Sequence, residues 1–140
     1  MRALAALLPL LTVGAAPGTS DLSVELTGLR STRGVVMLCL TAKPANFPDC
    51  KARADARFLT VPASAGTVTF ADVSAGRWAI AAVHDQDGDG KLDTLLGVPR
   101  EGIGFSRNPR LGWGPPSFDS SAVTLSGADR VERVRLRYFL

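Results

Sequence analysis

The stretch GRWAIAAVHDQDGDGKLD, residues 76–93, decides the fold and carries the strongest functional signal. In its first half Trp78, Ile80 and Ala82 alternate with other residues and share one face, a pattern typical of a β-strand. The strand ends at His84 and runs directly into a glycine-rich acidic turn. The stretch therefore predicts a sheet strand that delivers a group of carboxylates to one end of the sheet.

Similar strand patterns recur on both sides of this stretch, and helical periodicity is nearly absent. Residues 97–118 contain five glycines and four prolines, which argues against a helix or a central strand there. The pattern indicates an all-β chain: a single antiparallel β-sandwich, immunoglobulin-like or transthyretin-like, with a long Gly/Pro-rich loop over 85–118. The seven or so expected strands cover residues 22–27, 35–40, 57–61, 67–70, 77–84, 122–125 and 131–140.

The first sixteen residues read as a cleaved export signal. Arg2 precedes an apolar run from Ala3 to Val13, and small residues follow at 14–16. The run is too short to span a bilayer, so no transmembrane segment is expected in the mature chain; a short N-terminal core helix is the alternative. We therefore predict a signal peptide at 1–16, a sandwich domain at 17–140 and a periplasmic or secreted location.

Cys39 and Cys50 are the only cysteines, with ten residues and a proline-containing loop between them. In an oxidising compartment this arrangement predicts a disulfide. Two cysteines and a single histidine do not suffice for a closed zinc site.

The acidic loop, residues 85–93, has the spacing of a Ca²⁺-binding loop. Carboxylates at loop positions one, three, five and nine can converge on one cation, and glycine at position six permits a sharp turn. Position twelve is Leu96 instead of the usual glutamate, and an ordinary acidic turn between strands is the alternative. The candidate Ca²⁺ ligands are Asp85, Asp87, Asp89, the backbone carbonyl of Lys91, Asp93 and the nearby Glu101.

Catalytic chemistry has weaker support. His84 beside Asp85 could act as a general base in a small periplasmic hydrolase. Neither Ser106 nor Ser117 sits in a nucleophile elbow, and a structural role for His84 near the loop is the preferred interpretation. Asp85 and Asp93 as a glycosidase pair would need an apolar cleft to separate their pKa values.

A possible ligand-contact loop contains His84, Phe105, Trp113 and Phe118. The aromatic side chains could form a platform for a sugar or a peptide, but aromatics in long loops more often form the loop's own small core. Arg133, Arg135 and Arg137 form a basic stripe that is either a solvated face or a weak contact for anionic lipid or polysaccharide. A formal net charge of +3 is too small to indicate nucleic acid binding.

Three segments, GLRSTRGVVMLCL (28–40), AGRWAIAAVHDQDGDGKLDTLLGVPREGIGFSRNP (75–109) and WGPPSFDSSAVTL (113–125), are similar to a bacterial exported family known as domain-of-unknown-function family 2141. The resemblance runs from about Leu22 to Leu136 and implies a small periplasmic or secreted β-sandwich, with no activity attached. Together with the acidic loop, it favours a non-enzymatic envelope binding or accessory module, with Ca²⁺ as a possible cofactor. The expected partner is an envelope protein, a glycan or a small ligand.

Overall fold

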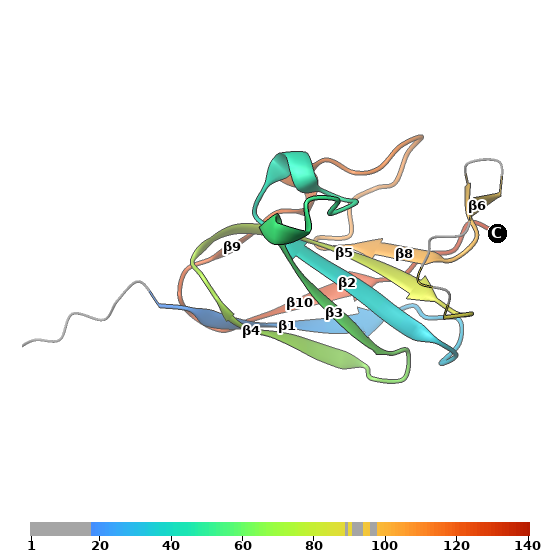
Figure 1. The fold of residues 1–140 in the computed structure, drawn as a ribbon, viewed down its shortest axis with the longest axis horizontal. Helices are drawn as coiled ribbons and strands as arrows, with labels where there is room; N and C mark the ends of the chain where they lie inside the picture. The colour runs from blue at the N-terminus through green and yellow to red at the C-terminus, as the bar shows by residue number, and fades with distance from the viewer. Residues whose placement is uncertain (1–17, 89, 91–93, 96–97) are drawn as a thin grey trace, which may run out of the picture.

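The computed structural model describes residues 18–88, 90, 94–95 and 98–140, and the predicted signal peptide lies outside these residues. Two sheets pack face to face, which confirms the all-β sandwich (Figure 1). The three-stranded sheet has the order β10 (Arg130–Arg135), β1 (Ser20–Thr27), β4 (Thr67–Val73). The five-stranded sheet has the order β3 (Ala56–Pro62), β2 (Val35–Thr41), β5 (Gly76–Asp85), β8 (Gly102–Phe105), and β9 (Val123–Leu125) also pairs with β5. A small hairpin joins β6 (Thr94–Leu95) to β7 (Val98–Pro99).

The main core lies between the sheets and follows the alternation of the sequence. Leu22, Val24 and Leu26 point inward from β1, and Ile80 and Ala82 meet them from β5. A second, smaller cluster covers the other face of β5, where Ala79, Ala81, Phe47, Phe105, Phe118 and Ala122 pack together. Because both faces of β5 are covered, the run of small apolar residues in this strand is explained.

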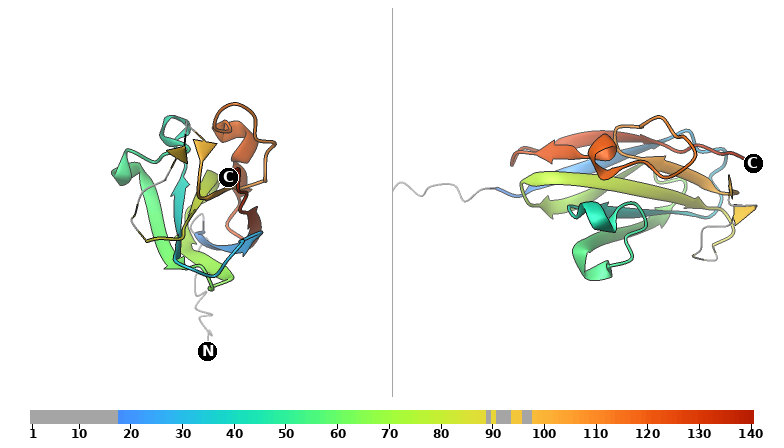
Figure 2. Two further views of the ribbon diagram at one scale, coloured as in Figure 1. Left: turned by 90° about the vertical axis from the view of Figure 1, so that its right-hand side faces the viewer. Right: turned by 90° about the horizontal axis from the view of Figure 1, so that it is seen from above.

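The edge of β5 is shared by two short strands. β8 pairs with Ala81–His84, and β9 pairs with Gly76–Trp78. The chain leaves the edge after β8 and returns as β9 after the short helix α1 (Phe118–Ser121), whose first turn is capped by the Ser117 side chain. Both views in Figure 2 show α1 outside the two sheets.

Two expectations about strands were wrong. No strand was expected within residues 97–118, but β8 forms there as the outer strand of the five-stranded sheet, paired with β5 and bridged to the segment after β10 through Ile103 and Arg137. The glycines that argued against a strand allow the close packing: a Cβ at Gly102 would lie 2.6 Å from the Tyr138 ring, and one at Gly104 2.7 Å from the Arg135 carbonyl. The sandwich is also not wholly antiparallel, because β1 and β10 pair in parallel.

The last strand is shorter than its alternation predicted. β10 ends at Arg135, Leu136 remains buried, and Tyr138 is only partly buried. Leu140, the last residue of the expected strand over 131–140, is 53% exposed.

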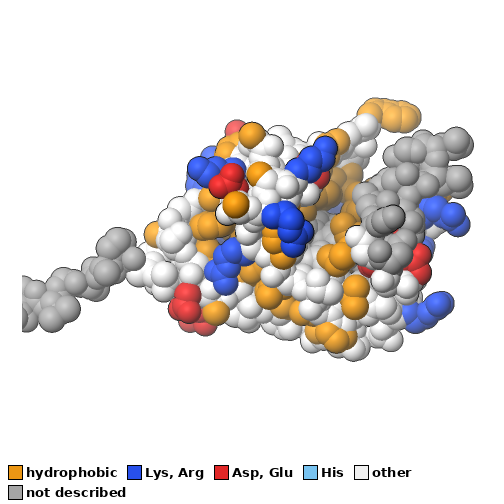
Figure 3. Space-filling view, in the orientation of Figure 1, with side chains coloured by type: hydrophobic (Ala, Val, Ile, Leu, Met, Phe, Trp, Pro, Cys, Tyr) orange, Lys and Arg blue, Asp and Glu red, His pale blue; other side chains and the backbone are white. Residues whose placement is uncertain are grey.

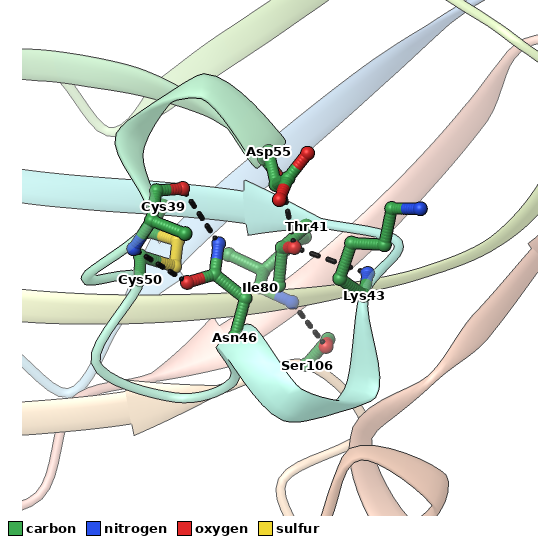
Figure 4. The surroundings of a disulfide bond; sticks show 9 residues. Cys39, Thr41, Lys43, Asn46, Cys50, Asp55, Ile80 and Ser106 are labelled. Atoms are coloured by element: carbon green, nitrogen blue, oxygen red, sulfur yellow. Dashed lines mark hydrogen bonds between the residues drawn. A yellow bond between two sulfur atoms is a disulfide. The ribbon is translucent and has the colours of Figure 1, made fainter.

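The segment between β2 and β3 contains the 3-10 helices η1 (Pro44–Asn46) and η2 (Arg53–Asp55). The predicted disulfide between Cys39 and Cys50 is confirmed and fastens this segment to β2 (Figure 4). The Asn46 side chain holds the turn by bonding both the amide and the carbonyl of Ala52, at 2.9 and 3.0 Å. Within the described residues, no helix is long and apolar enough to cross a membrane.

Candidate metal centre at the end of β5

Asp85, the last residue of β5, organises the start of the acidic loop. Its side chain is fully buried, and its two oxygens accept hydrogen bonds from the Gly88 and Gly90 amides at 2.8 and 2.7 Å. Both glycines have positive φ, +73° and +75°, which a residue with a side chain rarely adopts. The glycine spacing therefore lets the loop curl back over the Asp85 carboxylate.

Two further carboxylates approach Asp85. One ligand oxygen each from Asp85, Asp87 and Glu101 lie within 4.8 Å of one another. Glu101 immediately precedes β8 and is only 4% exposed, whereas Asp87 is exposed. The fold thus brings Glu101, sixteen residues along the chain, beside the first and third positions of the acidic loop. The other predicted ligands, Asp89, Lys91 and Asp93, lie outside the described residues.

The local environment keeps Asp85 negatively charged. Burial raises the pKa of Asp85, but hydrogen bonds with the Gly90 amide, the Asp87 side chain, the Gly88 amide and the Glu101 side chain together outweigh burial, so this pKa lies below its usual value. A second ionised carboxylate about 5 Å away would repel Asp85 by roughly 3 kcal/mol at an effective dielectric of about 20. A hard cation would relieve this repulsion, and carboxylate oxygens are the ligands that Ca²⁺ prefers.

His84, the residue before Asp85, is buried and bonds to segments outside the acidic loop. Its Nδ1 lies 2.6 Å from the Tyr138 hydroxyl, and its Nε2 lies 2.7 Å from the Arg33 carbonyl oxygen. A carbonyl can only accept, so Nε2 donates and Nδ1 accepts from the tyrosine in the neutral ring, a tautomer assigned from these partners. The phenol oxygen in turn accepts from the Arg30 amide at 3.2 Å. His84 therefore ties the 28–34 turn to the C-terminal segment, and not to the acidic loop as expected.

Gly34 and Tyr138 support this centre, and neither was predicted from the sequence to lie there. A Cβ at Gly34 would lie 2.1 Å from the Asp85 carbonyl oxygen, so only glycine lets the turn approach the end of β5. In the sequence Gly34 marks the start of a strand, but the sequence does not show that this glycine packs against Asp85. Tyr138 was visible only as one position of an alternating strand.

A family model described as "Uncharacterized protein conserved in bacteria (DUF2141)" matches residues 24–132. The chain belongs to this family. The match includes the acidic loop, Glu101 and the aromatic segment, which confirms the resemblance of the quoted segments. Searches of curated proteins and of solved structures returned no match.

The aromatic residues of this DUF2141 chain do not form one platform. Phe105 and Phe118 are each 7% exposed and meet Phe47 edge-on, with ring centroids 5.9 and 6.2 Å apart. Trp113 is fully exposed. The small-core interpretation is therefore confirmed for the two phenylalanines and is wrong for Trp113.

The two serines considered as nucleophiles have structural partners. Ser106 lies between β8 and β9. Its hydroxyl accepts from the Ile80 amide at 2.9 Å (Figure 4) and donates to the Ser121 carbonyl at 2.5 Å. Ser117 caps α1 through a 3.2 Å bond from the Ser120 amide. A hollow of about 220 Å³ lies between the disulfide-linked segment and β5, and His84 does not line it. Its lining residues are Ala42, Lys43, Ala54, Asp55, Ala56, Arg57 and Trp78.

Proposed function

We propose that this protein is an exported, non-enzymatic binding or accessory module of the bacterial envelope, in which Ca²⁺ orders the acidic loop. The observation that carries the proposal is the approach of Asp85, Asp87 and Glu101 to within 4.8 Å, two of them almost fully buried. This grouping falls where the sequence has the oxygen-rich spacing of a Ca²⁺ loop. Glu101 takes the place of the glutamate that position twelve lacks.

The disulfide supports the location. Disulfides persist in the periplasm and outside the cell and are rare in the cytosol. The Cys39–Cys50 bond therefore favours an oxidising compartment, in agreement with the signal predicted at 1–16.

The hydrolase alternative has less support. A general base needs a ring nitrogen within reach of a substrate proton. The two His84 nitrogens are engaged by Tyr138 and Arg33, and the ring is fully buried. Both carboxylate oxygens of the neighbouring Asp85 accept hydrogen bonds from loop amides, and neither orients the His84 ring.

The test is thermal unfolding of protein isolated from the envelope or medium, in chelator, in Mg²⁺ and in Ca²⁺. A dissociation constant of about 10⁻⁴–10⁻³ M is typical of extracellular Ca²⁺ modules. At about 10 mM Ca²⁺ mass action then adds roughly 1–3 kcal/mol, or an increase of about 5–10 °C in Tm.

Asp87→Ala should abolish the Ca²⁺-dependent increase in Tm, because this substitution removes an oxygen ligand and its charge from an exposed position. The matched control is Asp49→Ala, which removes another exposed carboxylate, from the disulfide-linked segment, and should leave the increase intact. An unchanged Tm in Ca²⁺ for the wild-type protein would leave the acidic loop as an ordinary turn.

A further inference from the structure

The chain between β8 and α1 forms a loop that is fastened at its base. Asn108 donates to the Arg133 carbonyl at 2.9 Å and accepts from the Arg135 amide at 2.8 Å, so the loop caps the outer edge of β10. Leu111 packs against the cluster that contains Phe118, where the loop ends. The tryptophan loop, residues 107–116, is therefore a fixed projection from the sandwich.

The tip of this loop displays an indole to solvent. Trp113 is 109% exposed, and a Cβ added at either neighbour, Gly112 or Gly114, would meet nothing within 4 Å. Phe58 shows the contrast: it is 37% exposed, and the Arg53 guanidinium covers its ring at 4.1 Å. No such cation covers Trp113 among the described residues. Hydrophobic atoms stand out from the surface where this loop projects (Figures 1 and 3).

Arginines surround the base of the loop. Arg110 lies within it, and Arg135 and Arg137 lie against Asn108, Pro109 and Leu111. Two neighbouring arginines of β10 are neutralised, Arg133 by Glu25 at 3.2 Å and Arg130 by Glu132 at 3.7 Å. Across the described part of the chain, Arg110, Arg135 and Arg137 form no ion pair with a carboxylate. The surface thus combines one displayed indole with uncompensated positive charge.

We propose that the tryptophan loop docks this protein on an anionic lipid bilayer. Trp113 would enter the interfacial region, where an indole finds both apolar and hydrogen-bonding surroundings, and Arg110, Arg135 and Arg137 would face the lipid phosphates. A specific protein partner is the weaker choice, because protein interfaces bury on the order of 1,000 Å² or more around several clustered anchors. A fluid surface needs only one anchor and a basic rim. The inference rests on the envelope location proposed above and not on the cation.

The experiment measures Trp113 directly. The chain has two tryptophans, so Trp78→Phe leaves Trp113 as the sole indole fluorophore. We expect a blue shift with phosphatidylglycerol-containing vesicles, quenching by brominated acyl chains, and neither effect with phosphatidylcholine vesicles alone. Co-sedimentation of the protein that retains Trp78 provides a second readout if Trp78→Phe perturbs folding.

Three variants separate the contributions of the indole and of the positive charge to vesicle binding. Trp113→Ala should weaken vesicle binding about tenfold or more, the effect expected of a central aromatic anchor. Arg110→Gln should weaken it about fivefold, which corresponds to ~1 kcal/mol per basic residue at an anionic surface, and the difference should vanish at high salt. Lys51→Gln is the charge-matched control, because its side chain is 87% exposed on another segment, and binding should be unchanged.

Equal vesicle binding by the wild-type protein and by folded Trp113→Ala would overturn the proposal. Capture by an anionic polysaccharide without capture by vesicles would do the same and would assign the loop to glycan. Each measurement is made in chelator and in Ca²⁺. Vesicle binding in chelator, without a Ca²⁺-dependent Tm, would refute only the metal proposal, whereas a Ca²⁺-dependent Tm without vesicle binding would refute only this one.

Discussion

The acidic loop and the tryptophan loop flank the same short strand, β8, but they invert the usual distribution of side chains. The acidic loop buries Asp85 against backbone amides, while the tryptophan loop exposes the largest apolar side chain available. A buried charge requires directed partners, since desolvation without them is costly. An exposed indole forgoes the hydrophobic stabilisation that a core position would provide. Both loops therefore depart from what stability alone favours, and these departures mark the two candidate functional surfaces.

The supports of the two loops also differ. The tryptophan loop is held by the packing of Phe105, Phe118 and Phe47 and by the Asn108 hydrogen bonds to β10. The acidic loop is held by hydrogen bonds from the Gly88 and Gly90 amides to the buried Asp85 carboxylate. Substitutions should therefore act on the first through lost volume and on the second through unsatisfied polar groups.

The largest effect is expected where the tryptophan loop joins the core. Phe118→Ala should lower the free energy of unfolding by about 3–5 kcal/mol, because it empties a buried aromatic site. Trp113→Ala, five residues away, should change it by no more than about 0.5 kcal/mol, because its side chain contributes no burial. Urea unfolding of both variants measures the difference. Comparable destabilisation would mean that Trp113 packs in solution, and the contrast between the loops would fail.

An intermediate effect is expected in the acidic loop. Asp85→Ala in chelator should lower the free energy of unfolding by about 2–3 kcal/mol, because the Gly88 and Gly90 amides lose their acceptors. Asp87→Ala should have a smaller effect, since Asp87 is exposed and the Gly88 and Gly90 amides keep their acceptor on Asp85. Denaturant titration in chelator compares the two. If Asp87 mattered as much as Asp85, the loop would not be organised around Asp85.

The smallest effect concerns Tyr138. Burial raises the pKa of Tyr138 above its ordinary value of 10.0, against the lowering effects of the Arg30 amide and the Arg30 charge. The folded phenol holds its proton more tightly than the unfolded one. Its contribution to stability is therefore complete below pH 10 and is lost as the pH rises through the higher folded value. Tyr138→Phe should cost about 1 kcal/mol at neutral pH, through the lost hydrogen bond to His84.

The ionisation of Tyr138 can be measured without overlap from other tyrosines, because Tyr138 is the only tyrosine in the chain. Tyrosinate absorbance follows its ionisation directly, and the Tyr138→Phe variant removes its share of the alkaline loss of stability. An alkaline unfolding profile identical in both proteins would show that the phenol is not coupled to folding.

The sequence predicted most strands because each buries one face and alternates, as β1 does. β5 is covered on both faces, but the alternation of Trp78, Ile80 and Ala82 still indicated a strand. The sequence did not predict β8, because the glycines of this strand are typical of loops. Their role becomes clear only in the structure, where Gly102 packs against Tyr138 and Gly104 against the Arg135 backbone. Likewise, the sequence shows how many aromatic residues the long loop contains, but it does not show which of them are buried and which are exposed. Whether a side chain points to the core or to solvent depends on neighbours such as Phe47, distant in the chain.

By itself the sequence determined the β-sandwich class, the disulfide pairing and the position of the acidic loop, since alternation, cysteine number and local spacing act over a few residues. Only the tertiary structure decided that Glu101 joins Asp85 and Asp87, that His84 is sealed by Tyr138 and Arg33, and that Trp113 faces solvent. Each of these depends on which strands lie side by side. That arrangement follows from the joint burial of many apolar side chains, and no single segment of the sequence encodes it.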